Sequence, residues 1–135
     1  MTATVTELRA LLRSLRPELN AGTYIYASLT PGTPRPPVEA VAEFTEREGR
    51  TLVVEEAAAR RAGLVPLFRA AWITLTVHSD LAAVGLTAAV SAALAAEGIA
   101  CNVIAAAHHD HLFVPVEQAA AAMKVLESLS DTAAT

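Results

Sequence analysis

The sequence predicts an α+β fold built on the ferredoxin-like βαββαβ plan, and three observations lead to this prediction. The second half alternates strand and helix patterns in the order β-α-β-β-α, which is five sixths of that plan. The first half shows a looser β-α-β-α order, which we interpret as a degraded copy of the same unit. Hydrophobic residues make up 53% of the 135 residues and charged residues 18%, which favours a folded core over disorder.

The first half contains short predicted elements separated by proline and glycine. Leucines at helical spacing follow a possible capping box of Thr4 and Glu7. Ile25, Ala27 and Leu29 alternate with other residues, as on one face of a strand. The expected elements are a helix that begins near Thr4 and stops at Pro17, a strand over 23–29, a loop over 31–37, a helix over 38–49 that Gly49 closes, a strand over 51–54 and a helix over 55–62.

The second half carries the clearer pattern. Ile73, Leu75 and Val77 alternate with threonines, as in a strand with one buried face. Leu86, Val90 and Leu94 lie four residues apart, as on the buried side of a helix. The expected elements are a strand over 72–78, a helix around 86–94 capped by Gly98, a strand over 99–107, a tight turn at 108–110, a returning strand that includes 112–114 and a final helix over 116–126.

We divide the chain into a degenerate N-terminal unit, residues 1–65, and a C-terminal unit, residues 66–135. No Gly/Ser-rich linker separates them, because the segment 64–72 is apolar. The first half is a candidate to supply the edge strand that the second half lacks. Since the helices fall on one side of the sheet, the open face needs a partner, and we expect a homodimer or a larger homo-oligomer.

Composition and charge exclude several classes of partner. The net charge of -4 and the 4% aromatic content do not suit nucleic-acid binding. The longest apolar stretch, residues 81–99, is too interrupted and too rich in alanine to span a membrane. Cys101 is the only cysteine, so no intrachain disulfide forms, and the N-terminus lacks a signal-peptide pattern. We therefore expect a cytoplasmic protein without a cofactor.

The turn from His78 to Thr87 is the stretch most typical of a ligand site. It joins a strand to a helix, whose first N–H groups have no partner inside the helix and suit a carboxylate. Gly85 permits close approach of a ligand, and Asp80 could receive an ammonium group. The alternative is structural: Ser79 and Asp80 only turn or cap the chain, and Gly85 only relieves crowding.

The run from His108 to His111 raises the question of a metal site. His109 and His111 can converge on one face of a strand, while His108 points away, so two ligands converge at most. A further ligand would have to come from a distant residue such as His78. The spacing therefore favours a polar hairpin turn over a metal centre.

Two neighbouring residues of the strand over 99–107 are further candidates. Cys101 lies in an apolar strand and is expected to be a small buried hydrophobe rather than a thiolate. Asn102 is a lone amide that needs partners if it is buried, either a ligand or neighbouring backbone, and it is equally compatible with a surface position.

The second half, from Ile73 to about Leu126, resembles the ACT domain found as a tandem regulatory unit in aspartate kinases. The matching segments are the strand-turn-helix 79–86 and the strand 98–104. The chain also resembles small stand-alone ACT-domain proteins of unknown function, and this resemblance covers nearly its full length. It rests on two shorter runs, Val84-Gly85-Leu86-Thr87 and His109-Asp110-His111-Leu112-Phe113-Val114-Pro115. A more distant similarity is to the cytosolic arginine sensors of animals, which consist of ACT repeats.

The resemblance implies a non-catalytic regulatory or sensory module that binds a small ligand, an amino acid above all, between two ACT units. The turn of one unit would face the second strand of its neighbour. The alternatives are a metal-binding protein or metal-dependent enzyme that uses His108–His111, and a ligand-free oligomerisation domain. The residues that the resemblance implies for the ligand site are Ser79, Asp80, Leu81, Val84 and Gly85, facing Asn102, Val103 and Ile104.

Overall fold

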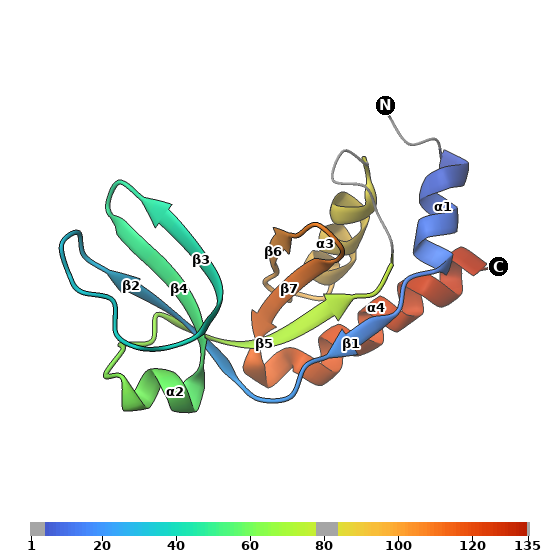
Figure 1. Ribbon diagram of the computed structural model, residues 1–135. Coiled ribbons are helices and arrows are strands. Elements are labelled where there is room, and N and C mark those ends of the chain that lie inside the picture. Colours follow the sequence, from blue (N-terminus) through green and yellow to red (C-terminus); the bar gives the residue numbers. More distant parts are fainter. Residues whose placement is uncertain (1–4, 78–83, 135) are drawn as a thin grey trace.

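The computed structural model describes residues 5–77 and 84–134 (Figure 1). It has the predicted α+β fold, and its paired strands run antiparallel. None of the described helices is long and apolar enough to cross a bilayer. The elements are α1 (Val5–Arg13), β1 (Pro17–Leu19), β2 (Tyr24–Leu29), β3 (Ala40–Glu46), β4 (Gly49–Glu55), α2 (Glu56–Arg61), β5 (Phe68–Leu75), α3 (Leu86–Ala96), β6 (Asn102–Ala105), β7 (Asp110–Pro115), the 3-10 turn η1 (Val116–Gln118) and α4 (Ala119–Ala134).

One curled sheet joins the two ferredoxin-like units, in the strand order β3-β4-β2-β5-β7-β6. Strand β5 is shared: residues 68–70 pair with β2, and residues 70–75 pair with β7. The short strand β1 also pairs with β5, through residues 73–75. The first half therefore supplies the missing edge strand of the second unit, as expected. The division of the chain after residue 65 stays a prediction.

The N-terminal unit differs from the prediction at two elements, the first being the short strand β1, which the sequence did not predict. The helix expected over 38–49 is wrong, because residues 40–46 form β3, which makes a hairpin with β4. The register shifts between Ala40 and Ala42, so Val41 is an extra residue that disturbs the alternation of the strand. The unit therefore has a loop between β2 and β3 where the ferredoxin-like plan has its first helix.

Two apolar cores lie on the helix side of the sheet. In the larger one, α1, α3 and α4 cover β5 and β7, and Leu86, Val90 and Leu94 are at most 3% exposed, as their spacing predicted. In the smaller one, Ala59 of α2 packs over Ile25 and Ala27 of β2. The helices of both units thus cover the same face of the sheet (Figure 1).

An aromatic cluster lies on the opposite, helix-free face. It contains Phe113 of β7, Trp72 of β5 and Tyr24 and Tyr26 of β2. The Tyr24 and Trp72 rings meet edge to face with centroids 5.2 Å apart, and the Tyr26 and Phe113 rings do so at 5.8 Å. The expected open face is therefore partly closed, because the curl of the sheet lets its own aromatic side chains bury one another.

Candidate functional site

The turn before α3 is described only from Val84 onward, so Ser79, Asp80 and Leu81 of the predicted site, and also His78, lie outside the described residues. Val84 is 51% exposed. Gly85 is the N-cap of α3, with a φ of 106° and no side-chain hydrogen bond to the helix. A side chain at this position is strained by the positive φ.

The structure also shows what lies next to Gly85. A Cβ added there would lie 3.2 Å from Cδ2 of Leu8 in α1. Packing against α1 is thus one reason for a glycine at this position, which agrees with the alternative interpretation that Gly85 relieves crowding. A valine at residue 85 would therefore strain the fold itself, so it cannot serve as a test of ligand approach.

The three predicted residues of β6 do not share one face. Asn102 is exposed, and its Nδ2 donates to the carbonyl oxygen of Phe113 at 3.4 Å. Ile104 packs against the aromatic cluster on the helix-free face. Val103 points the other way and packs against the larger helix-side core. Among the described strands, β6 pairs only with β7 and forms one edge of the sheet.

The described residues of the two predicted halves of the site belong to different elements. Gly85 lies against α1, whereas Asn102, Val103 and Ile104 form the outer strand β6. In the parts of the chain that the structure describes, no hydrogen bond joins Val84 or Gly85 to β6.

The histidine run forms the turn between β6 and β7. The N–H of Ala106 donates to the carbonyl oxygen of His109 at 3.1 Å, which closes the turn. His108 is exposed, while His109 and His111 are half-buried and interact electrostatically. Within residues 5–77 and 84–134, no group of three His, Cys, Asp or Glu side chains is placed to hold a metal ion. The run therefore lies in a hairpin turn, as its spacing predicted, and the absence of a metal stays a prediction.

His111 is held by two side chains of β5. The Nε1–H of Trp72 donates to Nδ1 of His111 at 3.0 Å, and Oγ1 of Thr74 lies 3.2 Å from the same nitrogen. An indole N–H can only donate, so Nδ1 is an acceptor and the proton of the neutral ring is on Nε2. Desolvation, followed by the nearby His109, lowers the pKa of His111 below its ordinary value. The imidazole is therefore held neutral, with Nε2–H as its donor.

Sequence reasoning missed the residue that extends this network. Nδ2 of Asn20, after β1, donates to Oγ1 of Thr74 at 3.0 Å and to the carbonyl oxygen of Trp72 at 3.2 Å. The alternating threonines of β5 were a signal for a polar face, but nothing near Asn20 in the sequence links it to His111. The network joins β1, β5 and β7 on the helix-free face.

Cys101 does not provide a nucleophile. Burial raises the pKa of its thiol to about 11, so the thiol stays protonated at neutral pH. Its side chain packs against the larger helix-side core. Cys101 is thus an apolar packing residue, as expected, but it is half-buried rather than buried.

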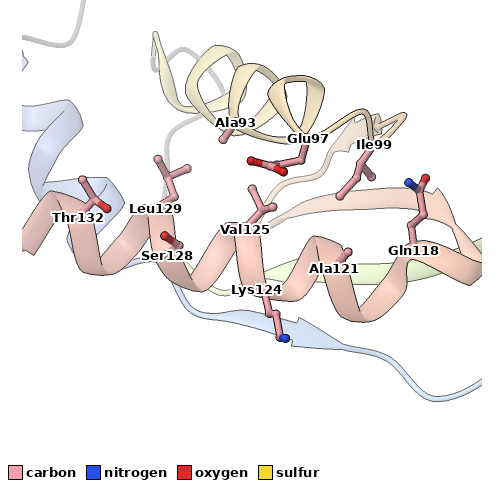
Figure 2. Close-up of a pocket in the computed structure, with 10 residues that line it drawn as sticks. All are labelled: Ala93, Glu97, Ile99, Gln118, Ala121, Lys124, Val125, Ser128, Leu129 and Thr132. Carbon is pink, nitrogen blue, oxygen red and sulfur yellow. The ribbon is translucent and has the colours of Figure 1, made fainter.

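A surface groove of about 560 Å³ lies between α3 and α4 (Figure 2). Val125 and Leu129 point from α4 toward α3, while Lys124 points away (Figure 2). The groove is wide open to solvent, and its polar side chains do not converge on one point. It therefore does not enclose a small molecule. Its lining residues are Ala93, Glu97, Ile99, Gln118, Ala121, Lys124, Val125, Ser128, Leu129 and Thr132.

Comparison with known families adds to this geometry. Two family profiles, both described as ACT domain, match the chain in tandem over residues 3–71 and 68–128. A Vibrio cholerae protein of unknown function, described as a possible transport protein, is 42% identical, with a TM-score of 0.83. That match covers 95% of this chain and 99% of the other. No curated protein matches the sequence.

Two more distant solved structures share the fold. The ligand-free regulatory subunit of aspartate kinase from Thermus thermophilus is 13% identical, with a TM-score of 0.65, and the match covers 84% of this chain and 95% of that one. An Agrobacterium tumefaciens protein is 17% identical at a TM-score of 0.65, over 86% of this chain and 89% of the other.

Proposed function

The chain belongs to the ACT-domain family, and we propose that it binds an α-amino acid at an interface between ACT units, as a regulatory module without catalytic activity. The observation that carries this proposal is the tandem match to ACT domains, which together span residues 3–128. The fold shared with the regulatory subunit of an aspartate kinase supports a regulatory role.

The N-terminus of α3 would bind the carboxylate of the ligand. This helix has 11 residues, and Gly85 at its N-cap has no side chain to occupy the first amide groups. Those N–H groups and the positive end of the helix dipole favour an anion. A carboxylate placed there accepts hydrogen bonds from backbone groups of the turn that includes Ser79, Leu81 and Val84.

Two polar side chains would complete recognition of an α-amino acid. Asp80 is the carboxylate nearest in sequence to the helix start, and it would pair with the ammonium group. Asn102 can both donate and accept, and its exposed position on β6 leaves it accessible to a neighbour. Both partners are needed, because a buried charge without a partner is strongly unfavourable.

A second copy of the chain would bring the halves of the site together. In one copy Gly85 lies beside α1, and β6 is an edge of the sheet that the described strands form. Unpaired edges favour association with another chain. The strand Asn102–Ile104 of one copy would then face the turn of the other, in a homodimer.

A thermal-shift screen of the twenty amino acids tests the proposal. A ligand at 100 times its Kd adds about 2.7 kcal/mol to the free energy of unfolding, which raises Tm by several degrees in a domain of this size. Two matched controls should leave Tm unchanged. One is the amine that lacks the carboxylate of the best ligand, and the other is the 2-oxo acid that lacks its ammonium group. If no amino acid raises Tm at about 10 mM, ten times a weak Kd of about 1 mM, the proposal is wrong.

A further inference from the structure

A recess lies on the helix-free face, between the two outer strands of the sheet. One wall comes from Val41 and Ala42 of β3, and the other from Ile104 of β6 and Ala106 of the following turn. Trp72, His111 and Phe113 complete the lining. The curl of the sheet brings β3 and β6 to the same recess, so it lies between the N-terminal and C-terminal units.

The size and the lining of the recess fit a small apolar group. Its volume is about 110 Å³, and among the described residues that line it, all except His111 have apolar or aromatic side chains. An apolar cavity of about 150 Å³ holds benzene in another protein, so this recess fits roughly four to six non-hydrogen atoms. The Trp72 and Phe113 rings are nearly parallel, 17° apart, with centroids at 6.2 Å.

One side chain of the lining can form a directed hydrogen bond. Nδ1 of His111 already accepts from Trp72 and lies within reach of Thr74. The remaining ring nitrogen, Nε2, carries the proton and can donate to an oxygen of a bound molecule. The hydrogen bond from Trp72 also fixes the orientation of the imidazole, so this donor is preorganised.

The charges near the recess disfavour an anion. In the described part of the chain, no Lys or Arg contributes to its lining. The ionisable groups that act on His111 are His109 and Asp110, and the Asp110 carboxylate would repel a second carboxylate. A neutral acceptor, such as a ketone or amide oxygen, avoids this repulsion.

We propose that this recess is a second ligand site, which takes a small uncharged molecule with one hydrogen-bond acceptor. The apolar part of the ligand contacts Trp72 and Phe113, and its oxygen accepts from Nε2–H of His111. The ligand contacts both units of one chain. This site adjoins the interface proposed for an amino acid, because Ile104 belongs to both, whereas Val84 and Gly85 are not among the described residues that line the recess.

The protein carries its own reporter for this site. Trp72 is the only tryptophan of the chain, so its fluorescence and its single indole N–H signal in a ¹H–¹⁵N spectrum report on the recess. The uncharged probes are cyclopentanone and isobutyramide, and isobutyrate is the charged counterpart of isobutyramide. We expect a saturable change in both signals with the uncharged probes, and at least tenfold weaker binding of isobutyrate.

A pair of variants locates the binding. Ala106 and Ala107 are neighbours in one exposed turn, but only Ala106 lines the recess. Ala106→Leu should fill the recess and abolish the response, whereas the matched control Ala107→Leu should retain it, with circular dichroism verifying that both fold. The proposal is overturned if neither uncharged probe gives a saturable response, if isobutyrate binds as tightly, or if Ala106→Leu responds like the parent protein.

Discussion

Replacement of Gly49 by alanine should destabilise the protein far more than replacement of any loop glycine. Gly49 begins β4, with a φ of 146°, a conformation that is essentially restricted to glycine. A Cβ at this position would lie 2.1 Å from the carbonyl oxygen of Leu29. Leu29 cannot move away easily, because it is paired with Arg50 in the sheet.

The expected cost follows from two contributions. The positive φ alone costs an alanine about 1–3 kcal/mol. The clash with a backbone oxygen requires a shift of β2 against β4, so the total should exceed about 3 kcal/mol, a large fraction of the stability of a small domain. For a chain of this length, that lowers Tm by about 10 °C.

Chemical denaturation and thermal unfolding, followed by circular dichroism, measure this effect. Gly32→Ala is the matched control: Gly32 also has a positive φ, 84°, but its Cβ would meet nothing within 4 Å. It should cost only about 1–2 kcal/mol. If Gly49→Ala costs no more than Gly32→Ala, β4 does not pack against Leu29 of β2 as described.

Two further predictions concern pH and assembly. Desolvation and then the nearby His109 lower the pKa of His111 in the folded protein below its ordinary value of 6.5. At a pH just below 6.5, the unfolded state therefore binds more protons than the folded state. The free energy of unfolding should decrease as the pH falls through that region. His111→Gln should weaken the dependence of the free energy of unfolding on pH, whereas the exposed control His108→Gln should preserve it. An equal pH dependence in both variants would contradict the lowered pKa of His111. Light scattering should give about twice the chain mass of 14.1 kDa, and a monomeric particle at tens of micromolar would contradict the homodimer.

The elements that the sequence predicted correctly have an unbroken hydrophobic period. Leu86, Val90 and Leu94 bury one side of α3, and Ile25 and Ala27 bury one face of β2. In such elements the local spacing and the tertiary packing require the same residues, so the pattern alone identifies the element.

The failure at β3 has a local cause. The extra residue Val41 places Val38, Val41 and Ala42 at helical spacing, although the segment is extended. Phe44, which is 71% exposed, adds no burial signal for a strand. An edge strand with a bulge therefore does not show the period of two that a regular, half-buried strand shows.

The network on the helix-free face depends on contacts that local patterns cannot predict. Trp72 and His111 are 39 residues apart in sequence, and Asn20 and Thr74 are 54 apart. The sequence did indicate that His109 and His111 share one face, because alternation in a strand is local. It could not indicate that Trp72 donates to Nδ1 of His111, since this requires the pairing of β5 with β7.

Calorimetric titration of the amino acid identified by the screen tests the central claim, that this ACT-domain protein binds an amino acid through the turn before α3. We expect saturable binding by the parent protein. Asp80→Ala should weaken it at least tenfold, since a charged hydrogen bond contributes about 1.5–3 kcal/mol. The control Asp131→Ala makes the same chemical change on an exposed side chain of α4 and should bind as the parent does. Equal affinity of Asp80→Ala and the parent would contradict the account.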